Sequence, residues 1–113
     1  YKKIARKVEF LVDAISINSV PWKHVYPENL SPLHHLGGGG VSGRPAQEHN
    51  WKMIKELAEH TKTPIIGPSA WEYKDIDKIK SLGAKAISFG SVFLRHPWRP
   101  TMYVKKYLRE KNI

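Results

Sequence analysis

Three short apolar segments alternate with amphipathic helical segments along this chain, and this alternation restricts the fold more than any other feature. The predicted strands cover residues 13–18, 64–67 and 85–90. Each is an apolar run bounded by small or polar residues, which is typical of strands buried on both faces of a sheet. Strands that alternate with helices are joined by crossovers and pair in parallel. The sequence therefore predicts an α/β fold built from parallel βα units.

Helical periodicity marks the segments that flank these strands. Apolar side chains recur in each at the spacing of one helix face, which in the first segment includes Ile4 and Leu11. Gly83 directly follows the third segment and is expected to end that helix in the left-handed conformation. The predicted helices cover residues 2–11, 46–60, 72–82 and 101–110.

The chain length limits how this α/β pattern can be completed. With 113 residues there is room for one small domain. A (β/α)₈ barrel needs eight strands and roughly 250 residues. We therefore expect either a small open sheet or, as a single segment over residues 1–113, the C-terminal part of a barrel. The first residue is Tyr1 and not Met, so we expect a piece of a longer protein. The remaining N-terminal part of the barrel, or a second copy in a homodimer, would then cover the open strand edges.

Composition excludes several classes of protein. Hydrophobic residues make up 41% and charged residues 26%, which excludes a disordered tail and a coiled coil. The chain has no cysteine, so it holds no disulfide framework, thiolate metal site or cysteine nucleophile. No apolar run approaches the roughly 20 residues of a membrane-spanning helix, and the N-terminal residues do not resemble a signal peptide. We expect a cytoplasmic protein.

The net charge of +9 is concentrated at the two ends of the chain. Residues 1–12 contribute +3 and residues 95–113 contribute +5. One interpretation is a nucleic-acid face. We favour the other, solvated helix faces that also attract an anionic ligand, because the basic residues follow the helix period; no nucleic-acid partner is expected. No metal site is expected either, because the adjacent His34 and His35 point apart and lack a carboxylate at ligand spacing.

Ligands of parallel α/β proteins bind at the C-terminal ends of the strands. The three predicted strand ends here carry small or polar residues and no charge. A glycine-rich segment over residues 37–43 belongs to the same region. Glycines let a ligand approach backbone N–H groups, which suits a phosphate. The strand ends are Asn18-Ser19, Gly67-Pro68-Ser69 and Gly90-Ser91.

The glycine-rich segment lies within an irregular stretch, residues 19–45, which is either functional or disordered. Gly38, Gly40 and Gly43 match the dinucleotide pattern G-x-G-x-x-G, but the nearest predicted strand ends about twenty residues earlier. We therefore disfavour a Rossmann site. A flexible loop without a ligand remains an alternative, whereas the direct entry into the helix at 46–60 favours a phosphate at Gly43.

Asn18 is the candidate for recognising a substrate. Its carboxamide offers a donor and an acceptor, which suits an amide or imide edge such as that of a pyrimidine. Ser19 adds a hydroxyl beside it. The alternative is that Asn18 only caps the following turn.

Four motifs in this order and at these separations resemble the C-terminal part of a dihydroorotate dehydrogenase. That family belongs to the FMN-dependent oxidoreductases with a TIM (β/α)₈ barrel. The resemblance runs from Asp13 to the last predicted helix. The motifs are Asn18-Ser19, GGGGVSGRP (37–45), TPIIGPSAW (63–71) and GAKAISFGSVF (83–93).

The resemblance implies oxidation of (S)-dihydroorotate to orotate in pyrimidine biosynthesis. In the family, a base removes the C5 proton of the substrate while a hydride passes from C6 to N5 of FMN. By position, Asn18 and Ser19 would bind the substrate, and Gly43 would contact FMN. Gly90 and Ser91 would hold the FMN phosphate.

Two departures from the family pattern restrict what the resemblance implies. The family often has two glycines where this chain has Ser69 and Ala70. Only the N–H groups of these two residues are therefore expected to contact the phosphate. The catalytic base of the family, a Cys or Ser, lies on an earlier loop outside this chain. No catalytic residue is therefore assigned here, the electron acceptor stays open, and the chain alone is expected to be inactive.

Two other functions stay open beside this one. A tRNA dihydrouridine synthase is a related flavin barrel, and the basic ends of the chain favour it, whereas Asn18-Ser19 favours dihydroorotate. A half-barrel that binds phosphate or nucleic acid without catalysis is the second alternative.

Overall fold

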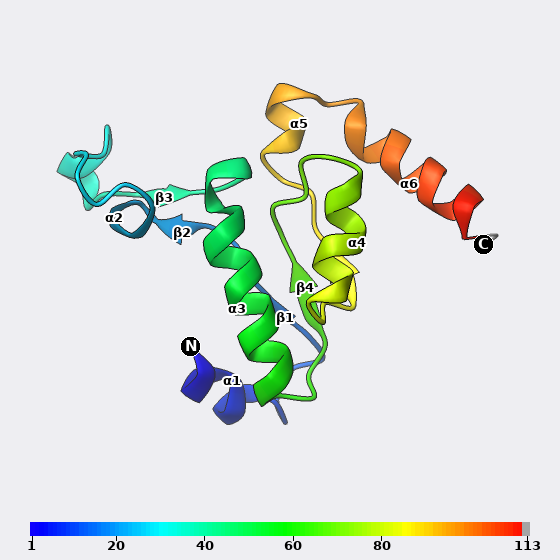
Figure 1. The fold of residues 1–113 in the computed structure, drawn as a ribbon. Coiled ribbons are helices and arrows are strands. Elements are labelled where there is room, and N and C mark those ends of the chain that lie inside the picture. Colours follow the sequence, from blue (N-terminus) through cyan, green and yellow to red (C-terminus); the bar gives the residue numbers. More distant parts are fainter. Residues whose placement is uncertain (112–113) are drawn as a thin grey trace.

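The three predicted strands pair in one parallel sheet (Figure 1). In a computed structural model, which describes residues 1–111, the strand order is β1–β4–β5. Ile15 of β1 pairs with Ile65 of β4, and Ile66 pairs with Ala86 of β5. The prediction of parallel βα units is confirmed, and the arrangement is compatible with a fragment of a βα barrel. The strands are β1 (Ile15–Ser16), β4 (Ile65–Gly67) and β5 (Ala86–Ile87).

All four predicted helices are present, and the first is the one that differs most. It ends at Val8, and of its apolar residues only Ala5 is buried, against α3. Ile4, predicted to face the core, is 66% exposed, because only one side of the helix meets α3. Leu11, also predicted to face the core, lies beyond the end of the helix and is 80% exposed. The helices are α1 (Lys2–Val8), α3 (Gln47–His60), α4 (Lys74–Ser81) and α6 (Arg99–Glu110).

Residues 20–46 contain more structure than the predicted irregular stretch. Two short strands pair antiparallel, with Val20 opposite Val41, and they share a small core with Ala46. Figure 1 shows this excursion projecting to one side of the parallel sheet, with α5 and α6 on the other. The elements of this excursion are β2 (Val20–Pro21), α2 (Trp22–Val25), η1 (His34–Leu36), β3 (Gly40–Val41) and η2 (Arg44–Ala46). The short helix α5 (Val92–Arg95), which lies outside the excursion, was also not predicted.

The main core lies between the sheet and the helices α3 and α4. Ile54, Ile65 and Ile79 are almost completely buried there. Gly67, the last residue of β4, lies where both helices approach the strand: an added Cβ would collide with Ile79 Cγ2 and stand 3.0 Å from Ile54 Cδ1. The close approach of the two helices to the strand end therefore requires glycine.

Gly83 ends α4 as predicted. It has φ +115°, its N–H donates to the Lys80 carbonyl, and the N–H of Ala84 donates to the Ile79 carbonyl. These two bonds form a Schellman motif, which satisfies carbonyls that the helix itself leaves free. The chain thereby turns directly into β5.

Tyrosine side chains join α4 to α6. The Tyr73 hydroxyl donates to Glu110 Oε2 at 2.6 Å, and the Lys106 ammonium lies 4.3 Å from the Tyr73 ring centre. Lys80 also hydrogen-bonds the Tyr107 hydroxyl. Within residues 1–111, no helix is long and apolar enough to cross a bilayer.

Gly67→Ala should destabilise the fold by about 1–3 kcal/mol, the usual cost of forcing a methyl group into a packed core. Gly90→Ala is the matched control, because a Cβ at Gly90 meets no atom within 4 Å. Urea unfolding of the two variants measures the difference. Equal stability of both would contradict the packing at the end of β4.

The hydrogen bond to Glu110, together with partial burial, raises the pKa of Tyr73 from 10.0 to about 12. Because the folded pKa lies above the unfolded one, this stabilisation is present below pH 10 and is lost as the pH rises toward 12. Glu110→Gln should bring the pKa of Tyr73 back toward 10, since its acceptor carries no charge. Ultraviolet titration of the phenolate tests this, and an unchanged titration curve would exclude the contact.

Candidate functional site

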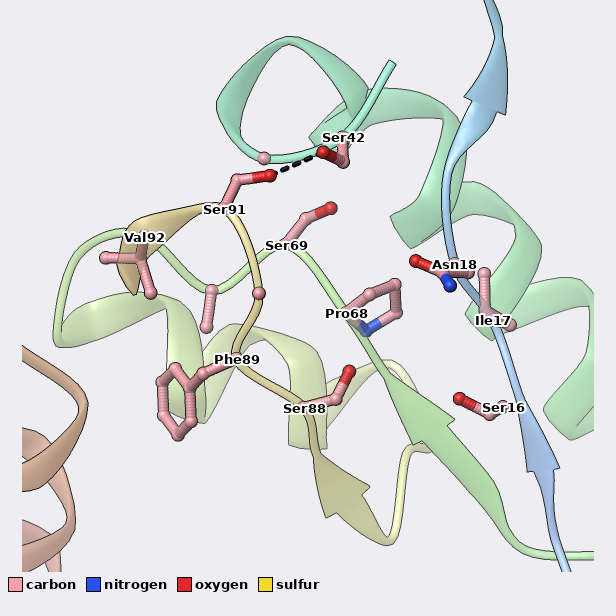
Figure 2. Close-up of a pocket in the computed structure, with 13 residues that line it drawn as sticks. Ser16, Ile17, Asn18, Ser42, Pro68, Ser69, Ser88, Phe89, Ser91 and Val92 are labelled. Atoms are coloured by element: carbon pink, nitrogen blue, oxygen red, sulfur yellow. Dashed lines mark hydrogen bonds between the residues drawn. The ribbon is translucent and has the colours of Figure 1, made fainter. Parts of the chain in front are cut away.

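A cavity of about 280 Å³ lies at the C-terminal ends of the three parallel strands (Figure 2). Its volume is near the lower end of the ~300–1,000 Å³ typical of small-molecule sites. Parallel pairing creates it, because the three strand ends lie side by side and the loops that leave them form its walls. The lining residues are Ser16, Ile17, Asn18, Ser42, Gly43, Pro68, Ser69, Ala70, Ser88, Phe89, Gly90, Ser91 and Val92.

The structure brings together six of the seven residues that the sequence proposed for binding. The exception is Ser19, which does not line this cavity. It lines a neighbouring hollow beside α1, which it shares with Asn18, and its hydroxyl packs toward Gly40 of β3. The six that line the cavity are Asn18, Gly43, Ser69, Ala70, Gly90 and Ser91.

Gly43 and Ser91 close one end of the cavity. The hydroxyls of Ser42 and Ser91 hydrogen-bond across 49 residues of sequence (Figure 2). Gly43 has φ +74° and ψ −147°, a backbone conformation that is essentially restricted to glycine. A Cβ on Gly43 would stand 3.0 Å from Ser91 Cβ. Glycine at this position is therefore needed both for the turn and for the contact between the two loops.

Gly90 faces open space. An added Cβ would meet no atom within 4 Å, and Gly90 does not have a positive φ. Its lack of a side chain therefore leaves room that the surrounding chain does not fill. Within residues 1–111, the N–H groups of Gly43, Gly90 and Ser91 have no backbone acceptor. Such N–H groups can donate to a ligand.

The loop after β4 forms the middle of the cavity wall. Ser69 has φ +70° and is the one non-glycine residue with positive φ among those the structure describes. Glycine adopts a positive φ freely, which fits the glycine that the dihydroorotate dehydrogenase family often has at this position. Ser69 adopts the positive φ at some cost in backbone strain. The N–H groups of Ser69 and Ala70 have no backbone acceptor within residues 1–111.

Sequence reasoning missed the polar side chains that lie behind this loop. Asn50 of α3 donates to Ser69 Oγ at 3.0 Å, and Asp75 of α4 accepts from the loop backbone. Asn50 could have been found, because it lies four residues before Ile54 and so interrupts the apolar face of the helix. Its Oδ1 is buried and has no hydrogen-bond partner among residues 1–111.

Within residues 1–111, no charged residue lines the cavity, although Arg44 directly follows the lining residue Gly43 in the sequence. Glu72 pairs with Arg44 at 3.7 Å and with Arg99 at 3.5 Å. Partial burial, together with the charges of Arg99 and Arg95, lowers the pKa of His96 below its ordinary value. The cavity itself therefore offers neutral donors, which suit binding of an anion. None of the lining side chains, which are serine, asparagine or apolar, is a general base at neutral pH.

Comparison with curated proteins finds similarity to dihydroorotate dehydrogenases. The chain is 28% identical over 102 residues, 86% of its length and 35% of the relative's, to the catalytic subunit of dihydroorotate dehydrogenase B (NAD(+)) of Saccharolobus solfataricus. It is 34% identical over 87 residues, 75% of its length and 29% of the relative's, to the subunit of the same name from Caldicellulosiruptor bescii. Dihydroorotate dehydrogenase A (fumarate) of Lactiplantibacillus plantarum is 29% identical over 82 residues, which are 72% of this chain and 27% of that protein.

The similarity is distant and partial. The chain spans only about a third of the length of the curated relatives it matches. No protein-family model matches it. The comparisons therefore suggest a relationship at the level of the enzyme family.

Gly43→Ala should destabilise the chain by about 1–3 kcal/mol, the cost of placing a side chain in a backbone conformation that only glycine adopts freely. It should also separate Ser42 from Ser91. Gly90→Ala again serves as the control. Chemical denaturation gives the stability, and the amide resonances of residues 42 and 91 report the contact between the loops. A Gly43→Ala chain as stable as Gly90→Ala would contradict the described geometry.

Proposed function

We propose that this chain supplies the FMN-phosphate site and part of the orotate site of a flavoprotein oxidoreductase that converts (S)-dihydroorotate to orotate in pyrimidine biosynthesis. The observation that carries the proposal is the cavity at the three strand ends, lined by residues that the resemblance had singled out. The similarity to dihydroorotate dehydrogenases supports it independently of the geometry.

The residues present fit a phosphate group. Gly90 leaves space where any side chain would stand, and N–H groups of three separate loops lack backbone acceptors within residues 1–111. Neutral donors of this kind bind phosphate without enclosing it in opposite charge. In the proposed site, Gly43, Gly90 and Ser91 hold the phosphate, and the N–H groups of Ser69 and Ala70 add to them.

Asn18 is proposed to bind the substrate from the opposite side of the cavity. In Figure 2, Asn18 lies on one side of Pro68 and Ser69, and Ser91 lies on the other. This separation allows the phosphate of FMN to bind on one side of the cavity and the pyrimidine ring of the substrate on the other. The Asn18 carboxamide can both donate to and accept from the ring edge of orotate. Ser19, which faces Gly40, would have to turn to join it.

The chemistry of the reaction comes from FMN, which accepts hydride from the substrate when it is bound. This chain's own residues bind and orient FMN and the substrate. Proton removal from the substrate is assigned to a base on another part of the barrel. The partners of the chain in this proposal are dihydroorotate or orotate and the N-terminal part of the barrel, with a second copy as the alternative cover for the sheet edges. The electron acceptor is a property of those other parts.

Gly90→Val and Asn18→Ala should have opposite effects on the two ligands. Gly90→Val should weaken FMN binding much more than it lowers stability, since its side chain enters space that the fold leaves open. Asn18→Ala should leave FMN binding unchanged and weaken orotate binding by about 2- to 13-fold, which corresponds to one hydrogen bond of ~0.5–1.5 kcal/mol. Flavin fluorescence and calorimetry with orotate give the two affinities.

Asn29→Ala is the matched control for Asn18→Ala, because Asn29 belongs to the excursion and does not line the cavity. It should change neither affinity. Retention of FMN by Gly90→Val together with its loss from Asn18→Ala would show that the two ends of the site are wrongly assigned. Failure of the complete protein, in which the N-terminal part of the barrel accompanies this chain, to bind either ligand would contradict the proposed function.

A further inference from the structure

Asp75 is a buried carboxylate that the proposed site does not use directly. It lies in the first turn of α4 and is 5% exposed. Its Oδ2 accepts the N–H of Trp71 at 2.9 Å and the N–H of Glu72 at 2.7 Å. A buried carboxylate persists only with such donors, because an unpaired buried charge is strongly unfavourable. Asp75 thus ties the loop that follows β4 to the start of α4.

Two amide side chains of α3 reach the same loop. Gln47 Nε2 donates to the Ser69 carbonyl oxygen at 2.8 Å and to Asp75 Oδ2 at 3.1 Å. Asn50, which is 1% exposed, donates to Ser69 Oγ at 3.0 Å. Gln47 therefore links Asp75 to Ser69, and the loop is held from two helices at once.

Ser69 is the residue that needs this support. Its φ of +70° is one that side chains disfavour, and such strain persists only where the surroundings determine it. The conformation also decides where the N–H groups of Ser69 and Ala70 point. Both residues line the cavity, and their N–H groups lack backbone acceptors within residues 1–111.

We propose that Asp75 is a positioning residue for the anion site: through the Trp71 and Glu72 N–H groups and through Gln47, it holds residues 68–72 so that the Ser69 and Ala70 N–H groups face the cavity. Asp75 itself does not touch the ligand. This inference rests on the proposed function and adds the element that gives a strained, non-glycine loop its binding geometry.

Asp75→Asn tests the proposal with a minimal change of shape. Oδ2 of Asp75 accepts all three hydrogen bonds, from Trp71, Glu72 and Gln47. An asparagine oxygen in its place can accept them too, but the charge that strengthens them is lost, and an amide NH₂ replaces Oδ1. FMN affinity should fall at least about tenfold, as expected when a charge-assisted hydrogen bond is lost. In the ligand-free chain, the amide resonances of Ser69 and Ala70 should shift. Titration with FMN and amide NMR of the 113-residue chain give both readouts.

Two control variants separate positioning from stability. Asp77→Asn makes the same chemical change on the same helix, at a carboxylate whose side chain is 71% exposed and which contacts Lys111 at 4.0 Å. It should change neither readout. Leu57→Ala shortens a buried core side chain that lines the hollow beside α1 and does not line the cavity, so it lowers stability away from the loop. It should leave the Ser69 and Ala70 resonances and FMN affinity nearly unchanged.

The outcomes are distinct. Unchanged Ser69 and Ala70 resonances in Asp75→Asn would overturn the proposal, as would a loss of FMN affinity no greater than that of a Leu57→Ala chain. If the complete wild-type protein binds no FMN, the proposed function fails, while the resonances of the ligand-free 113-residue chain still decide whether Asp75 sets the loop. Should Asp75→Asn fail to fold, Gln47→Ala provides the same comparison, because it removes the link to Ser69.

Discussion

The missing side chain of Gly67 lets two helices approach the end of the central strand at the same point. Ile54 of α3 and Ile79 of α4 pack where a Cβ of residue 67 would stand. Ala84, which precedes β5, lies 3.1 Å from the same position. Because both helices are fixed against this strand end, the loop that leaves it is held within reach of polar side chains from each. Gln47 and Asn50 of α3 both hydrogen-bond Ser69 of this loop.

In the part of the chain that the structure describes, the cavity presents backbone N–H groups and no charged side chain. Parallel pairing places three strand ends side by side, and glycine at 43 and 90 removes side chains where loops meet or where a ligand would stand. Glu72 pairs with both Arg44 and Arg99, and none of the three lines the cavity. In the proposed site, specificity for an anion depends on the directions of a few N–H groups. Those directions are only as well defined as the loop conformations behind them.

The sequence predicted the parallel sheet because each strand is a short apolar run, and it predicted α3 and α4 because their apolar faces keep the helix period. It failed where local pattern and tertiary contact disagree: Ile4 and Leu11 have helical spacing but nothing covers them in residues 1–111. The β2–β3 pair was missed because two-residue strands carry no period. Six of the residues that line the cavity were singled out in the sequence because they are glycines or small or polar residues at predicted strand ends and in the glycine-rich segment. Asp75 was not, since one acidic residue in a first helical turn is too common to suggest burial.

We propose that N–H groups of three loops, at Gly43, Ser69-Ala70 and Gly90-Ser91, bind the phosphate of FMN. Amide NMR of the chain titrated with FMN and, separately, with riboflavin, which lacks the phosphate, tests it most directly. We predict that FMN shifts the amides of Gly43, Ser69, Ala70, Gly90 and Ser91 together, and that riboflavin at the same concentration leaves them in place. Equal shifts with both ligands, or FMN shifts confined to other parts of the chain, would contradict it.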